Sequence, residues 1–269
     1  MPSNNPAFSR FGSAGNGQQY AGWGTQPQQS GAPTQFDPYA APSPYAATTT
    51  RYMTMDDVVT KTGLTFLVTV AAAAIVWALP GSAGWGLALP ALIVGFILGL
   101  VISFKQIANP AATLAYAAVE GIFLGAISEA FETIYQGGIV LQAVIGTMGV
   151  FAGMLVVYKT GAIRVTPKFT RWMLGALIGV LVLMVANGVA YLFTPDGLGL
   201  RNGGPLAIVF SLVVIGVAAF SLLLDFDMAD QAIRRGAPAK FAWYIAFGLL
   251  VTLVWLYLEI LRLLSYMRN

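Results

Sequence analysis

Seven long apolar stretches fill the chain from about residue 64 to residue 264, and few charged residues interrupt them. The hydrocarbon core of a bilayer is about 30 Å thick, so a helix needs about 20 apolar residues to cross it. Charged residues make up only 9% of the chain, whereas a typical soluble domain carries about 25%. The sequence therefore predicts an all-α, polytopic membrane protein with seven transmembrane helices.

The predicted spans are joined by short connections, so neighbouring helices are expected to pack antiparallel. The spans cover residues 62–79, 85–104, 111–131, 138–158, 172–193, 205–228 and 241–264. In the third span, small residues recur at four-residue spacing at Ala117, Gly121 and Gly125. This pattern allows two membrane helices to approach closely.

Residues 1–50 differ from the rest, because they are rich in Gly, Pro, Ser, Gln, Ala and Tyr and carry only Arg10 and Asp37 as charges. Such a segment cannot bury enough apolar surface to offset the entropy of ordering it. It also lacks the charged and apolar regions of a signal peptide. The sequence therefore predicts a disordered tail over 1–50 and a transmembrane domain over 51–269.

The basic residues predict the orientation of the helices. Eleven of the fourteen Lys and Arg residues precede the first span or lie in the connections after the second, fourth and sixth spans. Because Lys and Arg concentrate in cytoplasmic loops, the N-terminus is predicted in the cytoplasm and the C-terminus outside. The basic residues form no block that would indicate nucleic acid as a partner, and membrane lipid is the expected surrounding.

The chain contains neither Cys nor His. Disulfides, thiol catalysis and thiolate metal sites are therefore excluded, as is the side chain that usually titrates near neutral pH. Proton-linked behaviour would then depend on carboxylates. A bound metal would be a hard cation held by oxygen, although the sequence does not identify a metal, and no cofactor is expected.

A few acidic residues inside or against the spans are the candidate functional residues. A charge within the bilayer costs at least about 2.5–3.5 kcal/mol and persists where it has a role or a partner. Glu120 lies near the middle of the third span and has no basic neighbour within a helical turn. Asp225 and Asp227 lie at the end of the sixth span, and Glu259 lies in the seventh. These four residues are the predicted ion pathway or pH switch.

Two basic residues are candidate gate or latch partners of these acids. Lys105 ends the second span on the predicted cytoplasmic side, where it is able to face the acids of the sixth span. Arg262 follows Glu259 by three residues and is able to neutralise it. A plain interfacial ion pair is the structural alternative for this second pair.

Other polar residues have structural explanations that compete with a functional one. Asp230 shares a helix face with Asp227 and is expected to pair with Arg234, four residues on. An interhelical hydrogen bond explains Asn187. Glu129 and Glu132, at the outer end of the third span, either surround an outer mouth or are simply solvated.

Three motifs together resemble the Bax inhibitor family of transmembrane BAX-inhibitor-motif and YccA-like proteins. They are the stretch EGIFLGAIS that starts at Glu120, the acidic end of the sixth span, and the sequence LYLE that ends at Glu259. The similarity covers about residues 55–269. The tail resembles the Pro/Gln-rich leaders of actinobacterial members.

The resemblance implies a fold in which the last helix is central and the other six surround it, in a bacterial plasma membrane. Bacterial members of the calcium-leak branch are pH-sensitive pores, in which an aspartate on span 6 and one on span 7 share a hydrogen bond. Asp225 or Asp227 would match the first and Glu259 the second. The 32-residue interval from Asp227 to Glu259 departs from that branch, because it looks longer than the family interval.

Two functions are therefore expected from the sequence. The first is a cation leak, for calcium by resemblance, that carboxylate protonation gates. The second is a non-conducting membrane regulator that binds a membrane protease or another membrane protein. An enzyme is not expected, because the chain lacks the Gly-x-Gly-Asp run of an intramembrane aspartyl protease.

Overall fold

The computed structural model describes residues 51–79, 83–135 and 137–268. The tail predicted over 1–50 lies outside these residues. Within them, seven helices are long and apolar enough to cross a membrane, as predicted. They are α1 (Met55–Trp77), α2 (Ala83–Lys105), α3 (Pro110–Tyr135), α4 (Ile139–Thr160), α5 (Pro167–Ala190), α6 (Pro205–Arg234) and α7 (Ala242–Tyr266), with a short 3-10 helix, η2 (Ala239–Phe241), before α7.

Two helices extend well beyond their predicted spans. α1 starts before the apolar run because Thr54 and Asp57 form a capping box that begins the helix. α6 continues through its acidic end to Arg234 and stops before Gly236, whose φ of 68° suits glycine. Hydropathy detects only the part of a helix that lies in lipid. The predicted start of α1 and the predicted end of α6 therefore lie too close to the apolar run.

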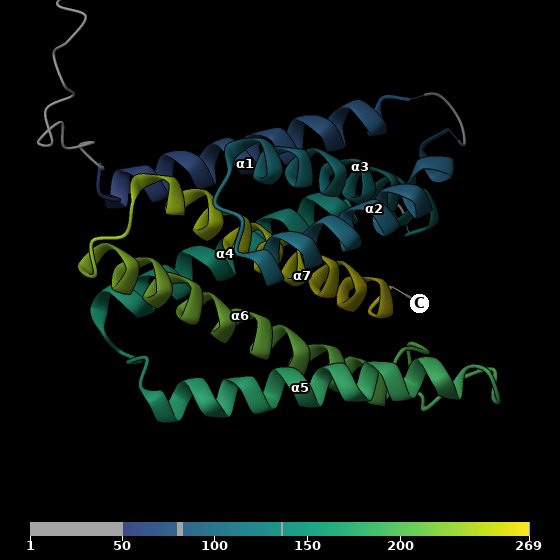
Figure 1. The fold of residues 1–269 in the computed structure, drawn as a ribbon. Coiled ribbons are helices and arrows are strands. Elements are labelled where there is room, and N and C mark those ends of the chain that lie inside the picture. Colours follow the sequence, from purple (N-terminus) through teal and green to yellow (C-terminus); the bar gives the residue numbers. More distant parts are fainter. Residues whose placement is uncertain (1–50, 80–82, 136, 269) are drawn as a thin grey trace, which may run out of the picture. The chain divides into compact units, whose positions relative to one another are not determined.

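The last helix is central, as the resemblance implied. α7 packs against α1, α3, α4 and α6 (Figure 1), and its fully buried side chains include Leu250, Leu256 and Leu261. The other two helices lie farther out, since α2 packs mainly on α3 and α5 packs mainly on α6. Four of the six other helices therefore form the immediate layer around α7.

The small residues of α3 bring it against α1, as the four-residue spacing predicted. A Cβ atom added to Gly121 would clash with the carbonyl oxygen of Thr69, and one added to Gly125 would clash with that of Ala73. The close approach allows the Thr69 hydroxyl to donate a hydrogen bond of 3.1 Å to the carbonyl oxygen of Ala117. Packing and hydrogen bonding therefore join the same two helices.

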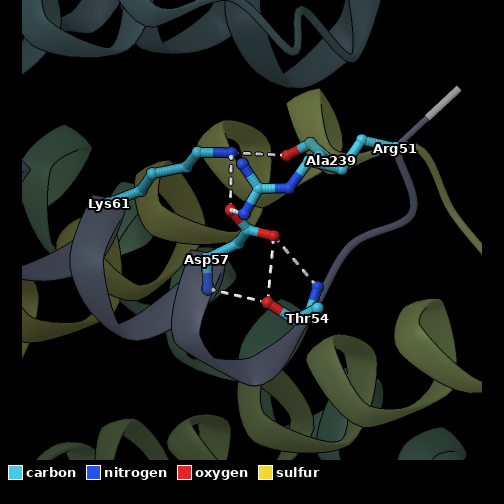
Figure 2. Close-up of polar contacts among 5 residues, drawn as sticks. All are labelled: Arg51, Thr54, Asp57, Lys61 and Ala239. Atoms are coloured by element: carbon cyan, nitrogen blue, oxygen red, sulfur yellow. Dashed lines mark hydrogen bonds and ion pairs between the residues drawn. The ribbon is translucent and has the colours of Figure 1, made fainter. Parts of the chain in front are cut away.

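The start of α1 is tied to the connection between α6 and α7. The backbone N–H of Met53 donates to the carbonyl of Ala237, and that of Ala239 donates to the carbonyl of Arg51, each at 2.8 Å. The ammonium group of Lys61 also donates to the Ala239 carbonyl (Figure 2). These contacts place the N-terminal end of α1 beside the N-terminal end of α7.

Asp57 organises the polar contacts at this end (Figure 2). Its side chain is only 8% exposed, and it forms ion pairs with Arg51 at 3.0 Å and with Lys61 at 3.8 Å. It also accepts a hydrogen bond of 3.1 Å from the backbone N–H of Thr54. A buried carboxylate is stable here because two cations and the helix cap satisfy it.

The opposite end of the bundle is held by Arg268, which follows α7. Its guanidinium donates to the carbonyl oxygens of Tyr135 and Gly137, at the connection between α3 and α4. The start of α1 and the connection between α3 and α4 therefore lie at opposite ends, which agrees with the antiparallel arrangement expected from short connections.

Candidate functional site

Asp225 lies on the side of α6 that faces α7, next to Gly248 and Thr252. The residue as a whole is half-buried, but its Oδ2 atom is enclosed and has no hydrogen-bond partner among the described residues. The carboxyl group lines a cavity of about 220 Å³, to which Ser103 of α2 also contributes. A buried carboxylate oxygen that lacks a partner is costly, so this position is the strongest candidate for binding a proton or a cation.

Glu120 is half-buried on the side of α3 that faces α2. A Cβ atom added to Gly95 of α2 would lie 3.1 Å from its Oε2 atom. One helical turn earlier on the same face of α3, Tyr116 lies within electrostatic range of Glu120. The ring of Tyr116 packs edge-on against Phe247 of α7, with 4.9 Å between ring centroids. Glu120 is therefore linked through aromatic side chains to the central helix.

One face of α2 carries small residues that lie beside Glu120 and beside the cavity that Asp225 lines. Gly95 faces the carboxylate of Glu120, Gly99 lies where a Cβ atom would be 3.3 Å from the ring of Tyr116, and Ser103 lines the cavity beside α6. These residues follow one another at four-residue spacing, so they share a face of the helix. This face of α2 was not among the predicted features, although the four-residue spacing of its small residues is visible in the sequence.

Glu259 is held by two arginines at the other end of α7. Its side chain is 2% exposed, and Arg201 binds it through two hydrogen bonds of 2.9 and 2.8 Å. Arg262 adds a third bond of 2.8 Å, which confirms the predicted pairing. Arg201 comes from the connection between α5 and α6, 58 residues before Glu259. The sequence contains no local signal that would have identified it as a partner.

The structure does not join Glu259 to the acids of α6. Asp225 lies beside Thr252, and the seven residues from there to Glu259 correspond to about 10 Å along a helix. The Glu259 carboxylate is occupied by guanidinium groups instead. The shared hydrogen bond that the resemblance implied is therefore absent from the described residues, as the long interval between the two positions suggested.

Asp227 has a different environment from Asp225. It accepts a hydrogen bond from the side chain of Gln231 one turn later. Together with Asp230 it lies within electrostatic range of Tyr158 on α4. Of the two acids that matched the family aspartate, Asp225 is therefore the one that faces α7.

Two further predictions concern the C-terminal ends of α2 and α6. Asp230 and Arg234 form the predicted pair, at 2.8 Å. Lys105 is exposed at the end of α2, and the ion pairs among residues 51–79, 83–135 and 137–268 do not include it. A role for Lys105 as a latch stays a prediction.

Of the three remaining polar residues, Asn187 and Glu132 cap chain segments, whereas the Oε2 atom of Glu129 is enclosed and has no hydrogen-bond partner among the described residues. Asn187 accepts a hydrogen bond of 3.0 Å from the backbone N–H of Leu198, so it fixes a connection and does not bridge two helices as expected. Glu132 accepts hydrogen bonds from the backbone N–H groups of Gly138 and Val140. These bonds stabilise the start of α4, where the dipole favours a negative charge.

The described residues contain no cluster of three or more acidic side chains that would hold a metal ion tightly. A cation beside Asp225 or Glu120 would meet one carboxylate at a time and would keep part of its hydration shell.

The sequence was compared with models of known protein families and with curated proteins. The sequence model of the family described as Bax inhibitor 1 like matches residues 5–269. No curated protein matches the chain.

Proposed function

Because the chain belongs to the Bax inhibitor 1-like family, we propose that it is a pH-sensitive cation leak of a bacterial plasma membrane, with calcium as the cation. The observation that carries this proposal is the enclosed, unpartnered Oδ2 atom of Asp225 inside a bundle of membrane helices. An ionisable group in that setting needs a counterion or a proton. Both occupants are exchangeable, and their exchange would couple cation passage to pH.

The route begins at the cavity beside Asp225. The excess of Lys and Arg at this end of the bundle supports a cytoplasmic location for it. From there the small-residue face of α2 leads towards Glu120, deeper in the bundle, and the rings of Tyr116 and Phe247 lie between the two acids. Ionised carboxylates would attract a cation along this face, and protonated ones would not.

The far end of α7 forms the closed part of this route. Two guanidinium groups surround the single carboxylate of Glu259, which leaves an excess of positive charge that repels cations. Opening would require the connection between α5 and α6, which carries Arg201, to move away from α7. Glu259 then acts as the residue that holds the route closed, and Arg262 helps to hold it.

Calcium flux through liposomes that contain the purified protein tests the proposal. We expect Asp225→Asn and Glu120→Gln each to lower the flux at least about tenfold, the change that about 1.4 kcal/mol of interaction energy produces. We also expect Asp225→Asn to flatten the dependence of flux on pH. Asp56→Asn is the matched control, because Asp56 is an exposed acid in the first turn of α1.

If both variants pass calcium as fast as the wild-type protein, a role for these two carboxylates is refuted. Absence of any flux from wild-type liposomes would favour the alternative, a non-conducting regulator that binds a membrane protease or another membrane protein. In that case, deletion of residues 1–50 is expected to abolish the effect that the protein has in cells, since the tail would supply the segment that binds the partner.

A further inference from the structure

A second polar cavity lies at the end of the bundle opposite Asp225. It measures about 310 Å³ and is lined by residues of α5, α6 and α7 and of the connection between α5 and α6. Four polar side chains contribute to it: Asn187, Arg201, Glu259 and Arg262. Apolar side chains, among them Trp255, complete the lining. The cavity is therefore amphipathic, and its polar groups include more donors than acceptors.

The charges of this cavity do not balance. Arg201 and Arg262 both bind the same carboxylate, that of Glu259, which neutralises only one of the two positive charges. The Arg201 side chain is 16% exposed, so water screens it poorly. The Arg262 side chain is 36% exposed, so the excess positive charge is only partly buried and is open to a ligand. Because a partly buried net charge is still costly, the cavity is suited to a ligand with one negative charge.

Hydrogen-bond donors that face the cavity have no partners. Asn187 is 4% exposed and uses its Oδ1 atom to accept from Leu198, whereas its Nδ2 group donates no hydrogen bond within the described residues. Arg262 uses only Nη1 to bind Glu259. Its Nε and Nη2 groups make no hydrogen bond to the described part of the chain. The Arg262 side chain is 36% exposed, so water or a ligand that enters the cavity is able to satisfy these donors.

We propose that this cavity binds a phosphate group that carries one negative charge. A phosphodiester has one negative charge at physiological pH and presents two oxygens in the geometry that a guanidinium fork binds. The polar residues of the cavity lie towards the ends of membrane-spanning helices: Asn187 is three residues before the end of α5, Arg201 is in the connection to α6, and Arg262 is four residues before the end of α7. Phospholipid head groups are expected at this level. A phospholipid and a free phosphate ion are the two sources of such a group. This inference does not depend on the proposed function.

Thermal unfolding of the purified, delipidated protein in an uncharged detergent tests the inference. The ligands are dihexanoylphosphatidylglycerol, whose net charge is −1, dihexanoylglycerol, which has the same acyl chains without phosphate, and inorganic phosphate at constant ionic strength. We expect the phospholipid, but not the diglyceride, to raise the Tm of the wild-type protein. A response to inorganic phosphate alone would assign the site to the free ion.

Two substitutions show whether the Tm shift arises in this cavity. Asn187→Asp keeps the acceptor for Leu198 and replaces the free amide donor with a negative charge. Arg262→Gln removes the unused guanidinium donors. We expect each to weaken the apparent affinity for the phosphate ligand at least about tenfold, which corresponds to about 1.4 kcal/mol. Lys168→Gln is the control, because Lys168 is an exposed cation at the opposite end of α5.

Three results would overturn the inference. The first is the lack of a response to either phosphate ligand, and the second is an equal response to phospholipid and diglyceride. The third is an affinity in both variants that equals that of the wild-type protein. If Arg262→Gln fails to fold because Glu259 loses a partner, Asn187→Asp still decides the question, since Asn187 makes no contact with Glu259 among the recorded hydrogen bonds.

Discussion

The substitution Gly121→Ala tests how closely α1 and α3 must approach. A Cβ atom at this position would lie 2.8 Å from the Cβ atom of Ala72 and even closer to the carbonyl oxygen of Thr69. Because a backbone atom is one of the two obstacles, no change of side-chain rotamer relieves the clash. Accommodating the extra methyl group requires α1 to move away from α3.

The expected loss of stability follows from three contributions. Overpacking of this kind costs about 1–3 kcal/mol, and replacing glycine by alanine inside a helix returns about 1 kcal/mol. Outward movement of α1 also weakens the hydrogen bond from Thr69 to Ala117, and such bonds between membrane helices contribute about 0.6 kcal/mol on average. The net destabilisation is therefore about 0.6–2.6 kcal/mol.

Reversible unfolding in mixed micelles, with increasing mole fraction of a denaturing detergent, measures this difference. Gly153→Ala in α4 is the matched control, because nothing lies within 4 Å of the position that its Cβ atom would occupy. We expect the control to be as stable as the wild-type protein or slightly more so. If Gly121→Ala unfolds at the same midpoint as Gly153→Ala, the close packing of α1 on α3 is refuted.

Three further predictions concern polar contacts. Glu259→Gln is expected to lower the Tm strongly, since removing one member of a buried ion cluster costs about 3–5 kcal/mol. An unchanged Tm would show that the two arginines do not need the Glu259 carboxylate as a counterion. Ser128 and Tyr257 share a buried hydrogen bond of 2.6 Å, so a double-mutant cycle of Ser128→Ala and Tyr257→Phe should give a coupling of about 0.6–1.7 kcal/mol; zero coupling would contradict the bond. Asp230→Asn should change stability by less than about 0.5 kcal/mol, because its pair with an arginine is exposed, and a large loss in chemical unfolding would mean that the pair is buried.

The features that follow from local sequence could be predicted. The apolar length of each span, the four-residue spacing of Gly121 and Gly125, and the pairing of Glu259 with Arg262 are all visible within a few helical turns. The central position of α7 came from resemblance alone. Every helix is apolar, so hydropathy does not distinguish a helix in lipid from one inside the bundle.

The contacts that the sequence could not predict join distant segments. Arg201 reaches Glu259 only because α5 and α6 place their connection over the end of α7. Asp57 was overlooked because the apolar run starts after it, although it is buried between two cations. Asp225 and Asp227 are two residues apart, and only the packing of α6 decides which of them faces α7.

The position of α7 has a consequence for how the protein is made. The ribosome synthesises this helix after the six that pack around or beside it, so the earlier helices enter the bilayer before their shared support exists. Their inward faces must remain loosely associated, or shielded by the insertion machinery, until translation has passed Tyr266. A premature stop codon ahead of Ala242 would therefore leave the whole assembly without its centre, whereas loss of α5 or α2 would remove an outer helix.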